Sequence, residues 1–200
     1  MGLLADFRSA AVARLQLPDD QRLSPASLFA LVRDMPLTAD DAGIGPAIED
    51  WRASQATKHI LLYQLYRDFG LDCVLIYAAQ EVTPSLRPWL PSELIDETVS
   101  DPIPDVHAFL RLNIGAEWMA IDATWPARTA SHGVPTNDRF EPGRDMTLAC
   151  DPDELFHVPD STDPTEFYEL LVSRIVGDAA ERRRSFLRRL DAWLGGETAD

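Results

Sequence analysis

Apolar residues recur at helical spacing along much of the chain and predict four helical segments. These segments cover residues 2–16, 25–35, 55–69 and 163–195. Ser24 and Pro25 give the second segment an N-cap followed by a proline at the first helical position. Gly70 is a stop signal for the third segment, and Gly177 is the candidate break in the last.

Two other stretches have the pattern of β-strands. Residues 73–78 are continuously apolar, which is typical of a central strand covered on both faces. Residues 106–124 predict a hairpin that turns at Gly115-Ala116. We expect loops over residues 36–46 and over the proline-rich residues 83–104. An irregular stretch as long as the second is often functional.

The predicted hairpin has one apolar and one polar face. Its turn would pair Ile114 with Glu117, Leu112 with Met119 and Leu110 with Ile121. In this register His107 and Asp122 become diagonal neighbours on the polar face. A carboxylate beside a histidine fixes the imidazole tautomer and suits it to acid–base catalysis. The bland alternative, a hydrogen bond that only stabilises the hairpin, stays open.

Composition excludes several classes of protein. The chain has 200 residues, and 33 acidic against 18 basic side chains give a net charge of −15. Such a chain should repel nucleic acid and anionic membranes. It contains no apolar run long enough to cross a bilayer and no secretory signal, so we expect a cytoplasmic single domain. We expect no cofactor.

Metal binding is the alternative interpretation of the histidines, and the sequence favours it less than acid–base chemistry. Two cysteines, Cys73 and Cys150, are too few for a structural zinc site or a disulfide scaffold. A metal site could be assembled formally from His59, His107, Asp122 and either His132 or His157. None of these histidines has the short spacing typical of metal ligands, so we expect no metal.

The order of a helix start, a buried strand, a His strand and an Asp strand is that of papain-like enzymes. The sequence resembles the transglutaminase-like superfamily over about residues 45–125, in Trp51-Arg52-Ala53-Ser54-Gln55-Ala56-Thr57-Lys58-His59, Leu65 to Gly70, Asp105-Val106-His107-Ala108-Phe109-Leu110 and Trp118-Met119-Ala120-Ile121-Asp122-Ala123-Thr124. The first stretch is similar to the variant motif Gly-Arg-Gly-Thr-Cys-Ser-Thr-Lys-His of one bacterial branch. The last two resemble the family's His strand and Asp-x-Thr strand.

The resemblance implies a fold and a domain organisation. The fold class is α+β, a transglutaminase-like (papain-like) core in which an antiparallel sheet packs on a central helix. The core would cover residues 46–150, with N-terminal helices in 1–45 and a C-terminal helical extension in 151–200.

The nucleophilic cysteine of the family is missing. The Thr57-Lys58-His59 register puts its position at Gln55, and a slip of one residue puts it at Ala56. A glutamine amide cannot form a thioester, but it can donate hydrogen bonds at a helix N-terminus. Cys73 lies in the apolar strand and cannot replace the nucleophile. Cys150 could act as the nucleophile only if the later loop folded back to the site.

The resemblance then implies two groups of site residues. The catalytic candidates are His107, Asp122, Gln55 and Lys58. The substrate-binding candidates are Trp51, Ala56, His59, Thr124 and Trp125. Lys58 is the only lysine beside 17 arginines, which favours a position that needs a compact ammonium; chance survival is the alternative.

Three functions are consistent with these residues. The first is acid–base chemistry by the His–Asp pair (hydrolysis, elimination or an acyl-transfer-type step) on a small amide- or carboxylate-bearing substrate. The second is a pseudoenzyme that binds a peptide, a small molecule or a partner protein in the old cleft. The third is a cysteine acyltransferase or hydrolase whose thiol has been substituted.

The C-terminal helix also carries a basic stripe, made of Arg182, Arg183, Arg184, Arg188 and Arg189. We expect these arginines to pair with the protein's own carboxylates. The alternative is a docking surface for a protein partner.

Overall fold

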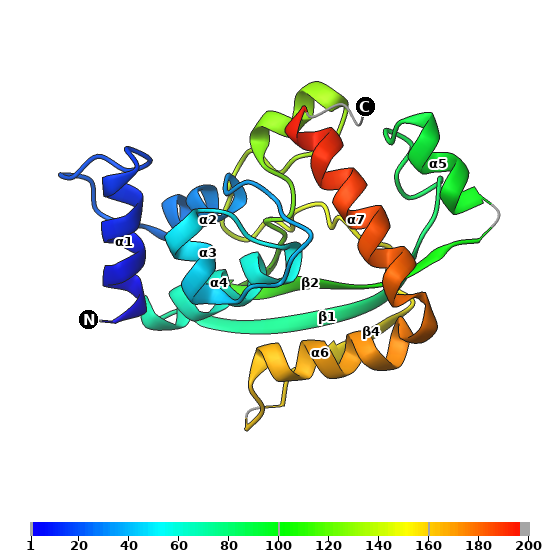
Figure 1. Cartoon of the computed structure of the whole chain (residues 1–200). Coiled ribbons are helices and arrows are strands. Elements are labelled where there is room, and N and C mark those ends of the chain that lie inside the picture. The colour runs from blue at the N-terminus through cyan, green and yellow to red at the C-terminus, as the bar shows by residue number, and fades with distance from the viewer. Residues whose placement is uncertain (1, 100, 160, 197–200) are drawn as a thin grey trace.

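Four antiparallel strands in the order β3-β2-β1-β4 form the centre of the fold (Figure 1). They are β1 (Asp72–Val82), β2 (Ile103–Ile114), β3 (Glu117–Ile121) and β4 (Glu154–His157). The computed structural model describes residues 2–99, 101–159 and 161–196. Its seven α-helices within these residues are α1 (Leu3–Ala13), α2 (Pro25–Arg33), α3 (Ile44–Asp50), α4 (Gln55–Asp68), α5 (Ser92–Val99), α6 (Pro164–Ile175) and α7 (Ala180–Gly195). The predicted α+β class is confirmed.

The β2–β3 hairpin has the predicted register. It pairs Ile114 with Glu117, and the ladder continues to Leu110 opposite Ile121. The two turn residues both have positive φ, +65° at Gly115 and +72° at Ala116. A two-residue turn with positive φ at both positions matches the right-handed twist of the strands.

Three regions differ from the sequence-based expectation. Helix α5 and the start of β2 lie in the stretch 83–104 that we expected to be irregular, because Pro91 and Pro102 bracket ten residues without a proline. Helix α3 begins inside the expected loop over residues 36–46, and Pro46 is tolerated there because the first turn of a helix needs no amide donor. Strand β4, for which we made no prediction, extends the sheet beyond the expected 46–150 core.

The remaining helices agree with the predicted segments, except that α1 ends at Ala13, three residues early. Helix α4 starts at the predicted residue, because the Ser54 side chain accepts a hydrogen bond from the Thr57 amide at 3.0 Å. The C-terminal helical segment is broken at Gly177, whose φ is +48°, and this break separates α6 from α7.

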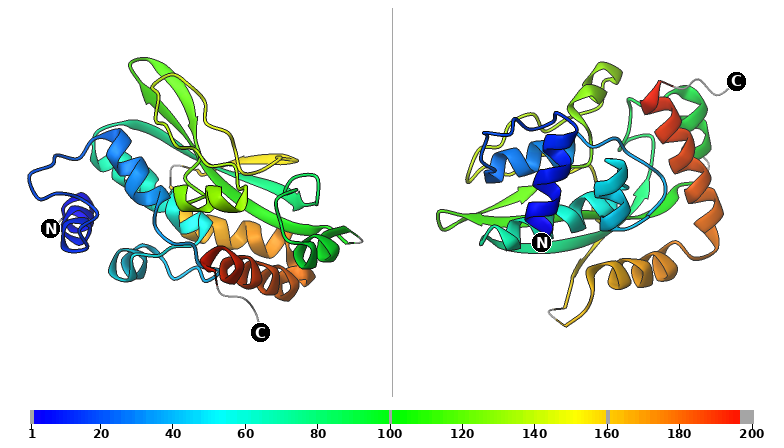
Figure 2. Two further views of the ribbon diagram at one scale, coloured as in Figure 1. Left: turned by 90° about the horizontal axis from the view of Figure 1, so that it is seen from above. Right: turned by 60° about the vertical axis from the view of Figure 1, so that its left-hand side comes forward.

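The largest apolar cluster lies on one face of the sheet. Tyr77 and Leu110 point to this face, where α4 and α6 cover them. The left view of Figure 2 shows α4, α6 and α7 along the same side of β1 and β2. A second apolar cluster packs under α7, and its buried members are Val82, Leu90, Leu94, Ile103, Trp125, Val134, Phe186, Leu190 and Leu194. The opposite face of the sheet carries only a small cluster around Phe109 and Cys150.

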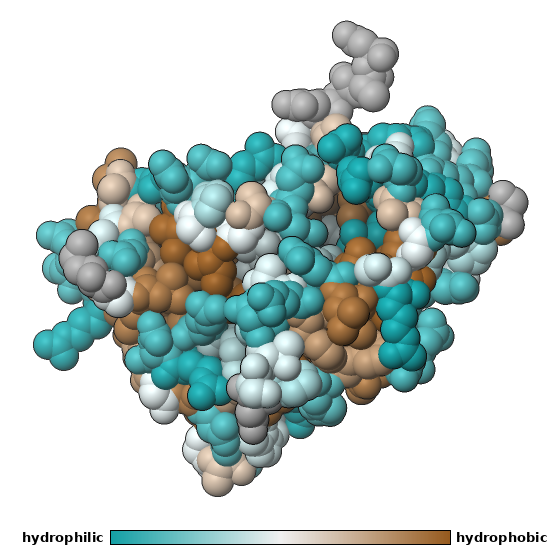
Figure 3. All heavy atoms as spheres, turned by 60° about the horizontal axis from the view of Figure 1, so that its bottom comes forward, coloured by the Kyte–Doolittle hydropathy of each residue, from teal (hydrophilic) through white to brown (hydrophobic). Residues whose placement is uncertain are grey.

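Apolar side chains also reach the surface, but from separate elements. Figure 3 shows apolar areas bordered by polar side chains on the face that carries α6. Large exposed apolar residues include Leu15 after α1, Leu155 in β4 and Leu170 in α6. Within the described ranges, none of the helices has the length and apolar character needed to cross a membrane.

Candidate functional site

The site forms at the part of β2 that β3 leaves unpaired. Strand β3 pairs only with residues 110–114 of β2. Beyond its end, the Gln55 side chain takes the place of a strand. Its Nε2 donates to the Ala108 carbonyl at 2.6 Å, and its Oε1 accepts the Ala108 amide at 3.2 Å. The amide group of Gln55 therefore fixes the first residue of α4 to the edge of β2.

His107 and Asp122 form the predicted hydrogen bond. His107 Nε2 lies 2.9 Å from Asp122 Oδ2, and both side chains are buried. The carboxylate also accepts the Ala149 amide at 2.8 Å on Oδ2 and the Thr124 amide at 2.9 Å on Oδ1. Burial disfavours ionisation of Asp122, but the charge and hydrogen bond of His107 outweigh it and lower the pKa of Asp122 below its usual value.

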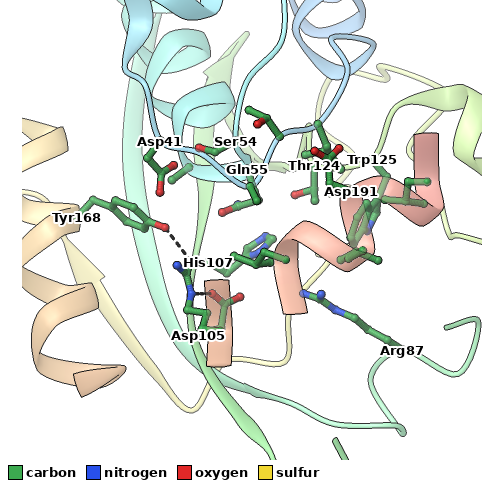
Figure 4. Close-up of a pocket in the computed structure, with 18 residues that line it drawn as sticks. Asp41, Ser54, Gln55, Arg87, Asp105, His107, Thr124, Trp125, Tyr168 and Asp191 are labelled. Atoms are coloured by element: carbon green, nitrogen blue, oxygen red, sulfur yellow. Dashed lines mark hydrogen bonds and ion pairs between the residues drawn. The ribbon is translucent and has the colours of Figure 1, made fainter. Parts of the chain in front are cut away.

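This pairing determines which imidazole nitrogen can act on a ligand. Because Nε2 carries the proton donated to Asp122, Nδ1 of the neutral ring is an acceptor. His107 lines a cavity of about 60 Å³, measured as the space open to the centres of water molecules. That is room for several waters or a ligand group of a few atoms. Gln55, Ala56, Thr124 and Trp125 line the same cavity, which Figure 4 shows around His107.

His59 lies behind this pair rather than in the cavity lining. Its Nε2 accepts the Ala123 amide at 2.9 Å, so the proton sits on Nδ1, which donates to the Gln55 carbonyl at 2.9 Å. Burial lowers the pKa of His59 to about 4, so the ring is neutral at pH 7. Gln55 Nε2 lies 3.2 Å from His59 Nδ1. Because Nδ1 carries the proton in this neutral tautomer, it cannot accept a hydrogen bond from the Gln55 amide.

Lys58 and Trp51 lie away from the cavity. Lys58 is fully buried, and its Nζ donates to the carbonyls of Arg33 at 2.8 Å and Thr124 at 3.1 Å. Burial holds the pKa of Lys58 well below its usual value. Trp51 stacks on Phe7 of α1, with 5.3 Å between ring centroids. Lys58 and Trp51, predicted from the sequence as site residues, do not line the cavity. Lys58 ties two backbone segments together, and Trp51 packs in the core.

Several polar residues of the cavity wall were not predicted from the sequence, and four of them are Asp105, Arg183, Tyr168 and Arg87. Asp105 of β2 accepts a hydrogen bond from Arg183 of α7 at 2.7 Å, and Arg183 also contacts the Tyr168 hydroxyl of α6 at 2.9 Å. The fourth is Arg87, from the proline-rich segment. The length of that segment and the arginine stripe were the available signals. Neither reveals which side chains face inward.

Asp105 is ionised in this arrangement. Burial opposes its ionisation, but Arg183 and Arg87 together lower the pKa of Asp105 to about 2. Its second oxygen accepts from Gln80 at 3.0 Å. The Asp105–Arg183 pair therefore joins β2 to α7 beside the cavity.

Neither cysteine lines the cavity. Cys73 belongs to the main core, and burial raises its pKa to about 12. The loop before Cys150 does fold back, since the neighbouring Ala149 amide donates to Asp122, but Cys150 itself belongs to the small cluster around Phe109, and burial raises its pKa. Among the described residues, no group of three His, Cys, Asp or Glu side chains is arranged to hold a metal ion.

All five arginines of the stripe on α7 pair with carboxylates of the same chain. Their partners are Asp101 for Arg182, Asp105 for Arg183, Glu181 for Arg184, Asp40 for Arg188 and Glu97 for Arg189. This agrees with the expected intramolecular pairing. The stripe connects α7 to β2, α5 and the loop before α3.

The chain was compared with protein-family models, curated proteins and solved structures, and none of them matches it. The function is therefore inferred from the geometry of the site.

Proposed function

We propose that this chain is a transglutaminase-like protein without the cysteine nucleophile, in which the His107–Asp122 pair performs acid–base chemistry on a small substrate. The observation that carries the proposal is the orientation of His107. A buried carboxylate holds its Nε2 and the residue lines the cavity, so Nδ1 is the nitrogen that we propose acts on a ligand. A histidine restrained in this way is suited to take up and return a proton.

The chemistry we propose is hydrolysis of a small amide or ester. His107 Nδ1 takes a proton from a water molecule, whose oxygen attacks the carbonyl carbon. The imidazolium then returns its proton to the leaving group, so the protein is unchanged at the end of the cycle. Asp122 keeps the tautomer and stabilises the transient imidazolium.

The second candidate function is binding without catalysis. It is favoured by Gln55, because the residue at the expected cysteine position uses its amide to hold β2. On this view the His107–Asp122 pair fixes the loop after β3 and shapes the cavity.

The two candidate functions are separated by an assay of 4-nitrophenyl acetate hydrolysis, in which the released nitrophenolate is measured. We expect His107→Gln and Asp122→Asn to lower the rate at least a hundredfold, a typical contribution of a positioned general base. His157→Gln is the matched control, because His157 is exposed on β4 and lies outside the cavity lining. Equal rates for the unchanged protein and His107→Gln would reject catalysis and leave the binding function.

A further inference from the structure

Arg87 is a buried cation with unmatched donors. Its side chain comes from the segment between β1 and α5, and the residue is 4% exposed. Among the described residues, Nε and Nη1 of its guanidinium have no hydrogen-bond partner. The guanidinium lies over the Trp125 ring, 5.5 Å from its centroid, and both residues line the cavity.

Such a group needs a partner of opposite charge. Arginine stays protonated in proteins, and a buried charge without a paired anion is costly. Burial lowers the pKa of Arg87, and the charge of Asp105 opposes that shift without accepting a hydrogen bond from Nε or Nη1. Thr124 adds a second unmatched donor in the cavity wall, because its buried Oγ1 also lacks a partner among the described residues.

The carboxylates of the cavity wall do not meet this need. Asp105 is satisfied by Arg183 and Gln80, and Asp191 pairs with Arg52 at 3.4 Å. Asp41 lies across the cavity from Arg87 in Figure 4, with His107 between them. The Arg87 end of the cavity therefore keeps an unmatched positive charge in a chain whose net charge is −15.

We propose that this cavity binds the carboxylate of a small ligand, which accepts hydrogen bonds from Arg87 and Thr124. This inference rests on the proposed function, because it names the substrate class of the same cavity. A carboxylate held at Arg87 places the adjoining carbonyl or amide of the ligand towards His107. A planar carboxylate group, with three heavy atoms and a single charge, suits a cavity of about 60 Å³. The acidic chain penalises a doubly charged phosphate more strongly.

Titration of the isotope-labelled protein, followed by nuclear magnetic resonance, tests the inference without turnover. The probes are acetate, the neutral isostere acetamide and inorganic phosphate, with the Trp125 indole and the Thr124 amide as reporters. We expect saturable shifts with acetate and an affinity for acetamide at least tenfold weaker. Arg87→Gln should weaken acetate binding at least tenfold. Arg144→Gln removes the same charge from an exposed ion pair with Glu141, outside the cavity lining, and should leave the affinity unchanged.

Several results would overturn the inference. They are equal affinities for acetate and acetamide, unchanged binding by Arg87→Gln, or tighter binding of phosphate than of acetate. If Arg87→Gln fails to fold, Arg87→Lys keeps the charge without the planar guanidinium and should weaken binding less. The comparison of acetate with acetamide needs no variant.

The experiment also separates this inference from the proposed function. Acetate binding that depends on Arg87, combined with ester hydrolysis that does not depend on His107, rejects the catalytic role alone. Hydrolysis that depends on His107, without acetate binding at Arg87, rejects the carboxylate site alone.

Discussion

Individual buried polar residues around the site fall into two groups. Asp122, His59 and Lys58 have their polar atoms matched by the backbone or by each other. Arg87 and Thr124 keep donors that no described residue accepts from. Matched buried groups are typical of structural roles, whereas unmatched ones suggest a missing ligand. Arg87, rather than Lys58, is therefore the candidate ligand-binding cation.

The first residue-scale prediction concerns the pH dependence that His59 gives to stability. Its pKa is about 4 in the folded protein, against 6.5 for an exposed histidine. As the pH falls, His59 of the unfolded chain therefore becomes protonated near pH 6.5, whereas His59 of the folded protein stays neutral until about pH 4. This linkage lowers the free energy of unfolding by about 3 kcal/mol as the pH falls from 6.5 to 4. Urea unfolding at pH 7, 5.5 and 4 measures the decline.

His59→Gln should remove most of this decline, even though the variant is less stable at pH 7. His157→Gln, at an exposed position, should keep it. The same slope in His59→Gln as in the unchanged protein would mean that another group is responsible. Asp122 and Asp105, whose pKa values are lowered, lose their stabilising effect only at more acidic pH.

At the scale of elements, the features that the sequence predicts correctly are those that depend on residues close together in the chain. The hairpin register follows from alternation and from a two-residue turn, and the start of α4 follows from the Ser54 cap. The sequence could not show that the Gln55 amide completes the edge of β2. That contact joins residues 53 positions apart and exists only once α4 has packed. For the same reason, the sequence could not show that Arg87 lines the cavity.

Strand β4 and helix α5 were missed for different reasons. Strand β4 has four residues, and their exposed pattern gives no alternation to detect. For α5, the five prolines between residues 83 and 104 outweighed the amphipathic spacing between Pro91 and Pro102. In both cases tertiary packing decided the structure of a segment whose local signal was weak.

The N-terminus of α4 supports an element-scale prediction about the lost nucleophile. A cysteine at position 55 would start the helix in the cavity lined by His107, where the helix dipole and an imidazolium lower a thiol pKa. We expect Gln55→Cys to react with iodoacetamide at pH 6.5 at least tenfold faster than Ala56→Cys, the one-residue alternative. The native cysteines contribute little, because burial raises both of their pKa values.

Mass spectrometry of the alkylated peptides measures both rates separately from Cys73 and Cys150. Faster reaction at position 56 would move the family register by one residue. If the cysteines at both positions react with iodoacetamide only as fast as an unperturbed thiol, the transglutaminase-like interpretation of this helix is contradicted.

At the scale of the whole molecule, the cavity lies where two apolar clusters meet. The main cluster joins α1, α2, α4 and α6 to the sheet, whereas the second cluster holds α7 and α5 against the ends of β1 and β2. Leu187, Leu190 and Leu194 of α7 line the cavity together with Gln55 of α4. The α7 side of the cavity wall therefore depends on the second cluster. Ion pairs between α7 and Asp105, Glu97 and Asp40 also hold α7 in this position.

The last prediction is that α7 opens separately from the main core. Phe186→Ala removes a fully buried ring from the second cluster, and Phe7→Ala removes one from the main cluster under α1. Each change costs about 3–5 kcal/mol. Amide hydrogen exchange should speed up in α7 for Phe186→Ala and in α1 for Phe7→Ala, with the other helix little changed. Phe186→Ala should also weaken acetate binding, because it opens the cavity, whereas Phe7→Ala should not. Equal acceleration of both helices in both variants would show that the molecule opens as one cooperative unit and that α7 does not close the cavity independently.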